Sequence, residues 1–591
     1  MVNIKINGKA IQVDDNISIQ EAAKLVNIKI PTLCYTKDLH AWGSCGICIV
    51  RTSGAGSTRM ARACTTQVAE NMDIITHDPE LIATRRTVLE LILSNHPDEC
   101  LTCSRSRSCE LQTLAEEFSI RNVPYKRVLS GRPIDDSNPA IVLNPGKCIS
   151  CGRCVIVCQE VQNVWALEFM GRGISGYIAS AMDTHFGDGP CIKCGQCSAH
   201  CPVGAIYERD DTSKVWPALQ NPDVHPVVQI APAVRVALAE EFGLPPGTLL
   251  TGKIYAAMRR LGFKTIFDTN FSADLTVMEE GTELVKRLGE KGSELPLITS
   301  CCPAWVDYLE KYYPDLIPNF STAKSPQQMM GAMIKSYWAG KAGVDPGKIC
   351  SVAVMPCTAK KWEARRNDDM KSAGHGWDVD IVITTRELVR MIKQAGIEIL
   401  DLSDEEADNP MGPYTGAGTI FGVTGGVMEA AVRTAYQLVT KKELGDVNFK
   451  AVRGLEGVKE AEVDFQVDVG NGLGTKIRIA VAHQMGNIET VLNKVREAKA
   501  AGKEVPYHFM EVMACRGGCI GGGGQPYGCT DKVRKQRTEG LYTDDEKSKY
   551  RCAHLNPNIS QVYKEYLGEP NGDKAHKLLH TKYQKLPLYV K

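Results

Sequence analysis

From about residue 215 onward, the hydrophobic positions change repeatedly from a short β-rich run to a longer segment with helical period. KTIFDTNFSADLTVMEEGTELVKRL, CSVAVMPCTAKKWEARR and IRIAVAHQMGNIETVLNKVREAKAAG all show this change. Strands that alternate with helices in this way are typical of parallel sheets covered by helices. The pattern therefore predicts an α/β domain with two largely parallel sheets flanked by helices.

The two ends of the chain have different patterns. Residues 1–80 begin with two short alternating segments, VNIKING and KAIQVDD, and continue with the helix-like SIQEAAKLVNI. Alternation of this kind indicates half-buried strands, so an α+β front end is expected. The tail YKEYLGEPNGDKAHKLLHTKY predicts a helix, a turn and a second short helix.

The composition is that of a globular protein. The 591 residues suffice for several domains. Hydrophobic residues make up 43% and charged residues 23%, and the net charge of zero gives no basis for binding nucleic acid or an anionic membrane. The apolar runs all fall short of the roughly 20 residues that a transmembrane helix needs.

The 23 cysteines are the unusual feature of the composition. Disulfide scaffolds are short and secreted, whereas this chain is long. Its first residues, MVNIKINGKAIQV, also lack the basic and apolar regions of a signal peptide. Metal binding in a reducing cytoplasm is therefore expected.

The first cysteine group is Cys34, Cys45, Cys48 and Cys64, spaced C-x10-C-x2-C-x15-C. Zinc is an alternative, but structural zinc sites usually combine two close pairs. One close pair with two distant cysteines favours a [2Fe–2S] loop, although the plant-type spacing is C-x4-C-x2-C. The segment resembles the ferredoxin-like domain at the front of complex-I-type and hydrogenase electron-transfer subunits.

The next group is His96, Cys100, Cys103 and Cys109, spaced H-x3-C-x2-C-x5-C. His96 and Cys100 are four residues apart, so one helical turn is expected to direct both towards one ion. Three thiolates and an imidazole also suit zinc, but the neighbouring patterns favour iron and sulfur. The segment resembles the [4Fe–4S] module with one histidine and three cysteine ligands, in which the neutral imidazole should raise the cluster's potential.

Residues 140–210 contain an internal repeat of C-x2-C-x2-C-x3-C, the bacterial two-cluster ferredoxin pattern. In this pattern the fourth cysteine of each run binds the other cluster. One [4Fe–4S] cluster is therefore expected on Cys148, Cys151, Cys154 and Cys201. The second is expected on Cys191, Cys194, Cys197 and Cys158.

Three more cysteine stretches lie in the α/β region: ITSCCPAW (298–305), VMPCTAKKWE (354–363) and MEVMACRGGCIGGGGQP (510–526). In the first two, cysteines fall where a strand is expected to end and a helix to begin, and the third follows the strand-like HFMEVM. Ligands of open α/β sheets bind at the carboxyl ends of the strands, so the three stretches are expected to share one crevice. The glycines of the third suit a backbone that passes close to a bulky inorganic group.

Together, TSCCPAW, MPCTAKKWE and ExMACxxGCxGGGGQP resemble the signatures of the [FeFe]-hydrogenase (iron-only hydrogenase) family. With the upstream cluster patterns, the resemblance extends over nearly the whole chain. YLGEP (566–570) and AHKLLH (575–580) resemble the family's small subunit, here fused to the large one.

The resemblance implies an H-cluster, which is a [4Fe–4S] cubane joined to a two-iron site carrying CO, CN⁻ and a dithiolate amine. By motif, the cubane ligands are Cys302, Cys357, Cys515 and Cys519, and Cys519 is the bridge to the two-iron site. Cys301 is then a free thiol facing the dithiolate amine.

The resemblance also implies a proton route through Cys301, Glu280, Ser321 and Glu283. Glu280 and Glu283 lie three residues apart and hence on one helix face. Without the resemblance, this pair would be interpreted as a solvated helix face.

Further residues are expected around the cofactor. Lys360 is placed to donate to one cyanide, and the APAVR turn with Pro232 and Ala233 faces the other. Some relatives have a hydroxyl residue at the position of Ala233, so only backbone donors are expected there. Met355 and Met513 each precede a ligand cysteine by two residues and are expected to contact the cofactor.

Arg516, between Cys515 and Cys519, departs from the usual pattern of the motif. Its charge either raises the potential of the cubane or anchors a nearby carboxylate such as Glu363. The two interpretations remain open at this level.

The function implied is reversible 2 H⁺ + 2 e⁻ ⇌ H₂, with electrons passing through one [2Fe–2S] and three further [4Fe–4S] clusters. The chain shows no convincing nucleotide or flavin motif, since GAGTIFG (416–422) only loosely resembles GxGxxG. The resemblance favours flavin- and NAD(P)-binding partner subunits with iron–sulfur clusters over a stand-alone enzyme that uses ferredoxin. The complex expected is NAD(P)-linked, of the kind that includes electron-bifurcating hydrogenases.

A non-catalytic role is the alternative from another class. Narf-like iron–sulfur assembly proteins share some of the cysteines, and sensory homologues alter the proton relay. This chain retains Cys301, Lys360 and the two relay glutamates, which disfavours the assembly and the sensory role. The expected domains are 1–80 ([2Fe–2S]), 81–125 (histidine-ligated [4Fe–4S]), 138–212 (two [4Fe–4S]), 215–550 (catalytic) and 551–591 (small-subunit-like).

Overall fold

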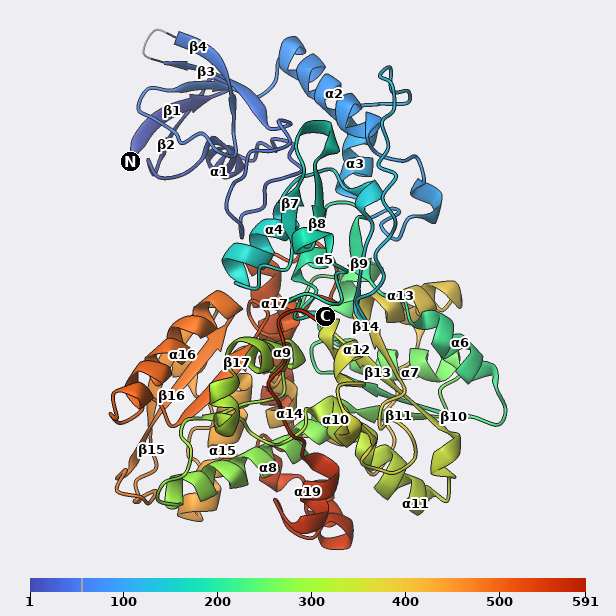
Figure 1. The fold of residues 1–591 in the computed structure, drawn as a ribbon, viewed down its shortest axis with the longest axis vertical. Helices are drawn as coiled ribbons and strands as arrows, with labels where there is room; N and C mark the ends of the chain where they lie inside the picture. Colours follow the sequence, from blue (N-terminus) through green and yellow to red (C-terminus); the bar gives the residue numbers. More distant parts are fainter. Residues whose placement is uncertain (55–56, 591) are drawn as a thin grey trace. The chain divides into compact units, whose positions relative to one another are not determined.

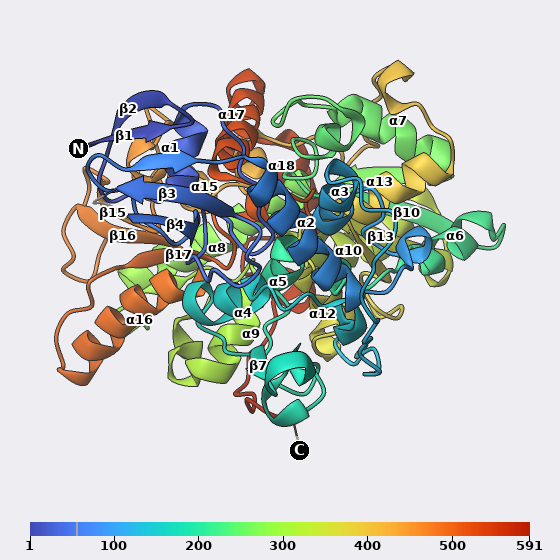
Figure 2. The same cartoon turned by 90° about the horizontal axis from the view of Figure 1, so that it is seen from above.

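Residues 1–54 and 57–590 are described by a computed structural model of the chain (Figures 1 and 2). The chain forms two compact units. The first comprises Met1–Val161, Trp165–Gly189 and His200–Tyr207, and the second comprises Gln162–Val164, Pro190–Ala199 and Glu208–Lys591. No helix within the described ranges is both long and apolar enough to cross a membrane.

The first unit opens with a five-stranded sheet in the order β2-β1-β5-β3-β4. Its strands are β1 (Val2–Ile6), β2 (Lys9–Val13), β3 (Ile49–Gly54), β4 (Ser57–Arg62) and β5 (Asp73–Ile75). β1 and β5 are parallel, whereas the other pairs are antiparallel. The two predicted strands thus form the hairpin β1–β2, and the predicted helix follows as α1 (Ile19–Leu25), capped by the Ser18 side chain.

The expected helical turn containing His96 and Cys100 is not formed. Helix α2 (Pro79–Ser94) ends before His96, and Cys100 begins the separate 3₁₀ turn η1 (Cys100–Thr102). Pro97 explains the break, because a proline disfavours the α conformation of the residue before it. The unit continues with α3 (Glu110–Glu117), β6 (Ile141–Leu143), α4 (Arg153–Ile156) and the hairpin β7 (Glu168–Met170)–β8 (Tyr177–Ala179).

The second unit contains two four-stranded sheets, as predicted. The first has the order β11-β10-β13-β14 and is entirely parallel. The second has the order β12-β17-β16-β15, with only β15 antiparallel. The strands are β10 (His225–Ile230), β11 (Thr265–Asp268), β12 (Leu297–Ile298), β13 (Ile349–Met355), β14 (Ile381–Thr384), β15 (Val458–Asp464), β16 (Lys476–His483) and β17 (Phe509–Met513).

Helices connect and cover these strands, as the strand-then-helix pattern requires (Figure 1). The main ones are α7 (Thr251–Leu261), α8 (Thr269–Gly289), α9 (Pro303–Tyr312), α10 (Pro326–Met333), α12 (Ala359–Glu363), α13 (Thr385–Gln394), α15 (Gly426–Thr440), α16 (Met485–Ala500) and α17 (Asp531–Lys547). After β10 the chain forms the 3₁₀ segment η6 (Leu238–Phe242) instead of an α-helix, and η6 ends at Gly243 with φ +82°.

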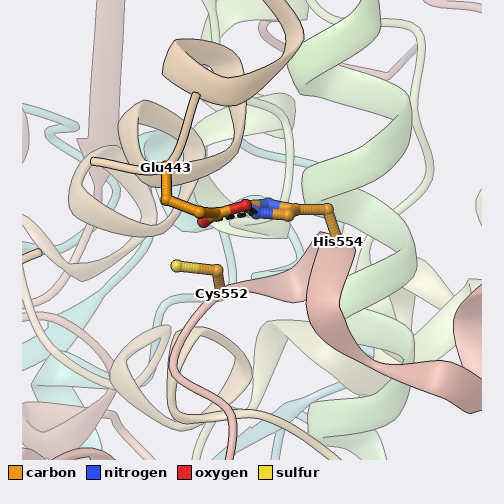
Figure 3. Close-up of side chains that lie close together, drawn as sticks. All are labelled: Glu443, Cys552 and His554. Carbon is orange, nitrogen blue, oxygen red and sulfur yellow. Dashed lines mark hydrogen bonds and ion pairs between the residues drawn. The ribbon is translucent and has the colours of Figure 1, made fainter. Parts of the chain in front are cut away.

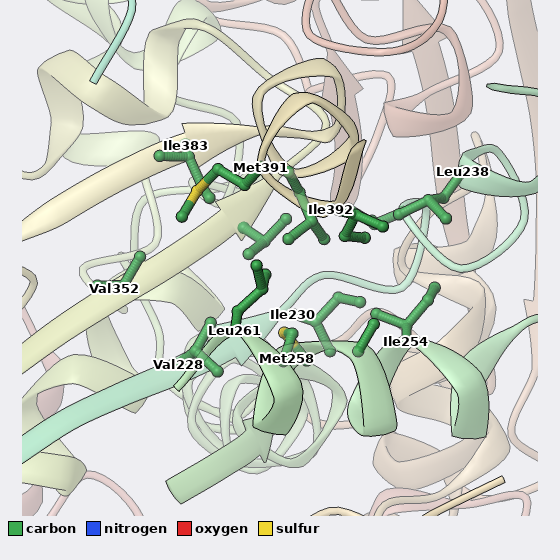
Figure 4. Close-up of a cluster of buried hydrophobic side chains, with 14 of the residues drawn as sticks. Val228, Ile230, Leu238, Ile254, Met258, Leu261, Val352, Ile383, Met391 and Ile392 are labelled. Atoms are coloured by element: carbon green, nitrogen blue, oxygen red, sulfur yellow. The ribbon is translucent and has the colours of Figure 1, made fainter. Parts of the chain in front are cut away.

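One core of the second unit lies between the fully parallel sheet and helices α7 and α13 (Figure 4). Val228 and Ile230 of β10 share this core with Met258 of α7 and Met391 of α13. The tail, with η14 (Ala553–Leu555), α18 (Pro557–Val562) and α19 (Asp573–Leu579), contributes to a second core with α8 and α10. The two helices predicted in the tail are thus present and buried on one side.

Candidate active site

The cysteines of the three catalytic-type loops lie where three strands of the second unit end, as predicted. Cys302 is the N-cap residue of α9, directly after β12. Cys357 lies between β13 and α12, and Cys515 follows β17. Because β13 belongs to one sheet and β12 and β17 to the other, the site lies where the two sheets present their carboxyl ends to each other.

The loops enclose a cavity of about 80 Å³. Its wall is largely apolar and contains all ten residues that the sequence places next to the cofactor. These are Cys301, Cys302, Cys357, Cys515, Cys519, Lys360, Met355, Met513 and Ala233, together with Pro232 of the same turn.

The arrangement of sulfurs fits an iron–sulfur cluster. Burial raises the pKa of Cys357 to about 12 and also raises the pKa values of Cys302 and Cys519. These thiols therefore become thiolates only if positive charge, such as that of iron, comes close. N–H groups already point at two of the sulfurs: Ala514 N lies 3.4 Å from Cys302 Sγ, and Gln196 Nε2 lies 3.2 Å from Cys515 Sγ. Donors to sulfur are a normal feature around cluster ligands.

The glycines around Cys519 pack against the backbone of neighbouring segments, which is a second reason for glycine at these positions. A Cβ on Gly522 would lie 2.2 Å from Pro356 O, and one on Gly523 would lie 2.4 Å from Cys194 O. Gly518 has φ +91°, which few other residues tolerate. The loop thus needs glycine to fit between neighbouring segments as well as to pass near a cofactor.

The acidic residues expected to form the proton route lie on α8, close to the cavity. Ser321 Oγ donates to Glu283 Oε2 at 3.0 Å, and Glu283 Oε1 pairs with the Arg287 guanidinium at 2.6 Å. Burial, reinforced by the Glu283 carboxylate, raises the pKa of Glu280 to about 8. Burial and then the Glu280 carboxylate raise the pKa of Cys301. The sequence-predicted relay residues are thus neighbours in the structure.

Lys360 is buried and carries its charge at the cavity wall. Its Nζ donates to Cys301 O at 3.1 Å and to Glu363 Oε2 at 2.9 Å. Glu363 also accepts from Ser325 Oγ and Gln327 Nε2. A paired lysine of this kind remains protonated, and the Glu363 carboxylate accordingly raises its pKa against the effect of burial.

Arg516 anchors a carboxylate, but the partner is Asp531 rather than Glu363. Its Nε and Nη2 lie 2.8 and 2.7 Å from the two carboxylate oxygens, in a bidentate arrangement. Asp531 is the first residue of α17, so the pair connects the cysteine loop to the start of that helix.

The turn at residues 231–235 is fixed at both ends. Gln525 Nε2 donates to Ala233 O at 2.9 Å, and Arg235 forms a fully buried ion pair in which its Nη2 donates to both carboxylate oxygens of Asp268. Gln525, Asp268 and Gln196 were not expected among the residues that contribute to the site. Gln525 stands inside the quoted glycine motif, whereas Asp268 and Gln196 carry no local signal that links them to it.

The first unit brings together several of the other predicted cluster ligands. Cys48 Sγ lies 3.3 Å from Cys64 Sγ, and Cys45 N lies 3.5 Å from Cys34 Sγ. Burial raises the pKa values of Cys148 and Cys151, and the charge of the nearby Cys201 raises them further.

His96 and Cys103 also have surroundings that suit cluster ligands. Burial lowers the pKa of His96 to about 4, and its Nδ1 has no hydrogen-bond partner among the described residues. A neutral imidazole with a free ring nitrogen fits a metal ligand. Gly204 packs against Cys103, because a Cβ there would lie 2.4 Å from Cys103 Sγ.

Comparisons with known families match successive stretches of the chain. The C-terminal domain of the iron only hydrogenase large subunit matches residues 224–523, and the iron hydrogenase small subunit matches 531–586. Upstream, a 2Fe-2S iron-sulfur cluster binding domain matches 1–79, the NADH-ubiquinone oxidoreductase-G iron-sulfur binding region matches 85–124, and a 4Fe-4S dicluster domain matches 147–205.

Individual relatives extend over most of the chain. The NADP-reducing hydrogenase subunit HndD of Solidesulfovibrio fructosivorans is 46% identical over 597 residues, covering 99% of each chain. Iron hydrogenase 1 of Clostridium pasteurianum is 39% identical over 592 residues, covering 99% of this chain and 100% of that protein. Among solved structures, apo [FeFe]-hydrogenase HydA1 from Chlamydomonas reinhardtii is similar with a TM-score of 0.56 and 43% identity, over 64% of this chain and 99% of that one.

Proposed function

Because the chain belongs to the iron-only hydrogenase family, we propose that it catalyses the reversible reaction 2 H⁺ + 2 e⁻ ⇌ H₂ at an H-cluster held in the cavity of the second unit. The observation that carries the proposal is the convergence of four buried or half-buried cysteines on this cavity, next to a fifth thiol, Cys301. An apolar cavity with few polar groups also suits a small, uncharged product such as H₂.

Cys302, Cys357, Cys515 and Cys519 would hold the cubane, and Cys519 would also connect it to the two-iron site. When bound, this group supplies the redox-active iron at which protons and electrons combine. The chain itself holds the thiolates with N–H donors, excludes water with Met355 and Met513, and presents the Lys360 ammonium to the negative ligands of the group.

Cys301, Glu280, Ser321 and Glu283 are proposed to move protons between the cavity and the exterior. A carboxyl with its pKa near 8 is protonated at neutral pH and can both give and accept a proton close to that pH. The Ser321 hydroxyl, which donates to Glu283, can pass a proton by accepting one and donating another. Glu283 then delivers it to the surface, since its side chain is 13% exposed.

Electrons are proposed to reach the cavity through one [2Fe–2S] and three further [4Fe–4S] clusters. The donor sets are the cysteine and histidine groups given above, in domains 1–80, 81–125 and 138–212. The catalytic domain 215–550 and the small-subunit-like tail 551–591 complete the proposed division. Because the cluster ligands form separate groups along the sequence, electrons can enter at more than one cluster. This suits a protein that exchanges electrons with more than one redox partner.

The chain is further proposed to work in the cytoplasm as the catalytic subunit of an NAD(P)-linked complex, of the kind that includes electron-bifurcating hydrogenases. The support is the likeness over the whole chain to a protein named as a subunit of an NADP-reducing hydrogenase, together with the absence of a nucleotide motif in this sequence. Flavin- and NAD(P)-binding partner subunits would then accept or supply the electrons, and ferredoxin would be a second partner. A purified native species at the chain's own 64.7 kDa would favour the stand-alone ferredoxin enzyme instead.

The activity is tested by measuring H₂ evolution from a reduced low-potential dye with the maturated, purified protein. Cys301→Ala is expected to lower the rate about 10²-fold or more, because it removes the proton-carrying group nearest the cofactor. Its infrared bands from CO and CN⁻ should persist, since the cubane ligands are unchanged.

Cys350→Ala is the matched control, because this half-buried thiol of β13 does not line the cavity. It should retain full activity. Full activity in Cys301→Ala would remove that thiol from the relay. Absence of the CO and CN⁻ bands in the maturated wild type would instead favour a non-catalytic homologue.

A further inference from the structure

Glu443, Cys552 and His554 form a cluster of three metal-binding side chains away from the cavity (Figure 3). One ligand atom of each lies within 4.8 Å of the other two. Glu443 belongs to the loop after α15, whereas Cys552 and His554 flank the first residue of η14. The cluster thus joins a loop of the region that resembles the large subunit to the region that resembles the small subunit.

The distances within the cluster suit a tetrahedral ion. His554 Nε2 lies 3.1 Å from both carboxylate oxygens of Glu443. With zinc-to-ligand bonds of ordinary length, a nitrogen and an oxygen on one tetrahedral ion are about 3.3 Å apart, and a sulfur and a nitrogen are about 3.6 Å apart. Both separations fit inside the observed limit of 4.8 Å, so small side-chain rotations would allow an ion to bind.

The imidazole of His554 is oriented by a second contact. Its Nδ1 lies 3.1 Å from Thr434 Oγ1 on α15. When Nδ1–H donates to this hydroxyl, the lone pair of Nε2 faces Glu443 and Cys552, which is the usual arrangement of a metal-binding histidine. The ring is also held in place by burial, because its side chain is only 8% exposed.

The surrounding charges permit a divalent cation. The nearest guanidinium groups, those of Arg433 and Arg551, are both paired with Asp545. One thiolate and one carboxylate together balance the charge of a divalent ion. Glu443 is 55% exposed and Cys552 is buried, so the ion can enter from solvent and reach the thiol behind the carboxylate.

We propose that Glu443, Cys552 and His554 bind a zinc ion, with water as the fourth ligand, and that this ion fastens the tail to the loop after α15. A mixed sulfur, nitrogen and oxygen set selects zinc over magnesium and calcium, which prefer oxygen ligands alone. The site does not depend on the proposed hydrogenase chemistry, because none of its residues lines the catalytic cavity. The role of the ion is structural, because it connects η14 to the loop after α15 through side chains from two separate segments.

The test uses the full-length chain with its iron–sulfur clusters loaded, so that the cluster cysteines cannot take up zinc. The protein is equilibrated with zinc and a competing chelator of nanomolar affinity, desalted, and analysed for zinc by mass spectrometry. About one zinc ion per chain is expected, with one sulfur at about 2.3 Å in the zinc X-ray absorption spectrum.

Cys552→Ser, His554→Ala and Glu443→Gln are each expected to lower retained zinc about tenfold or more. Glu443→Gln changes a half-exposed side chain, so it remains informative if either of the other variants folds poorly. Cys350→Ser is the matched thiol control and should retain the ion. Zinc should also raise the thermal midpoint of the wild type and leave that of Glu443→Gln unchanged.

Zinc content equal in the wild type and Cys552→Ser would overturn the proposal. So would an absorption spectrum with several sulfur neighbours, because that would place the ion in a cluster site. If the loaded wild type retains no zinc at all, the contact between Glu443 and His554 is an ordinary ion pair and the proposal fails.

Discussion

Replacement of Asp268 by alanine is expected to destabilise the second unit by about 4 kcal/mol. Asp268 ends β11 and holds Arg235, and both side chains are completely buried. The two guanidinium contacts measure 2.9 and 2.7 Å. Asp268 also accepts from Asn270 N at 2.9 Å and thereby caps α8, and it accepts from the Tyr255 hydroxyl.

The expected loss of stability follows from the groups that Asp268→Ala leaves without a partner. Removal of one partner of a buried ion pair costs about 3–5 kcal/mol, because the remaining charge has lost its compensation. Loss of the helix cap adds about 1 kcal/mol. Arg235 keeps contacts with the Tyr414 hydroxyl at 2.5 Å and Asp544 at 3.4 Å, which reduce the cost of the unpaired charge. A total of about 4 kcal/mol is therefore expected.

Hydrogen exchange at the backbone amides of β11 and the first turns of α8 is the suitable assay. A chain with several cofactor domains does not unfold in one step, whereas exchange gives the free energy of local opening. Arg235→Met combined with Asp268→Leu should cost much less than Asp268→Ala, because apolar residues replace the pair without leaving a charge. Asp368→Ala is the control, since its side chain is 91% exposed, and it should leave these amides unchanged.

A cost below about 1 kcal/mol for Asp268→Ala would refute this reasoning, because it would mean that the Arg235 charge is solvated in the folded protein. Equal costs for the double variant and Asp268→Ala would likewise show that lost packing, rather than an unpaired charge, is responsible. Since Arg235 ends the turn that lines the cavity, a loosened turn should also slow H₂ evolution in the protein that remains folded.

Three further substitutions test other parts of the structure. Ser321→Ala should lower H₂ evolution about 10²-fold by interrupting the route to Glu283, while Ser321→Thr, which keeps the hydroxyl, should remain active. Burial raises the pKa of Asp274 to about 7, so the folded state binds more protons than the unfolded state between about pH 4 and 7. Its contribution to stability is therefore lost as the pH rises through 7, and Asp274→Asn should remove that part of the pH dependence in denaturation experiments at several pH values. Arg516→Gln should change H₂ evolution by about fivefold at most, because Asp531 already balances the charge; a larger change would support an effect on the cubane's potential.

The strand-and-helix order of the second unit was predictable because it depends on local periodicity. KTIFDTNFSADLTVMEEGTELVKRL became β11 and α8, and Glu280 and Glu283 lie on that helix as expected. The positions of the cysteines at strand ends were predictable for the same reason. The prediction of a helical turn from His96 to Cys100 was wrong, because Pro97 disfavours the helical conformation of His96 despite the four-residue spacing.

Partners that are distant in sequence could not be predicted. The donor Gln196 is separated from Cys515 by 319 residues, and Glu443 is separated from His554 by 111. Such pairs are set by how the strands and helices pack, and the chain carries no periodic signal for them. Arg516 is a different case: the sequence suggested a nearby carboxylate such as Glu363 as one of two interpretations, and the structure pairs Arg516 with Asp531, 15 residues away.

The cations around the cavity are paired with carboxylates, whereas the nearby acid Glu280 is left able to change its protonation. The ammonium of Lys360 is balanced by Glu363, and the guanidinium of Arg235 by Asp268. Glu280, by contrast, forms no ion pair in the part of the chain that the structure describes, and its Oε1 has no hydrogen-bond partner there. A carboxylate without a cation in a buried site favours its neutral form, and this explains why its pKa rises to about 8. Fixed charges that are paired elsewhere do not respond to a proton, so Glu280, whose charge acts on Cys301, is a group beside the cavity whose charge a proton can change.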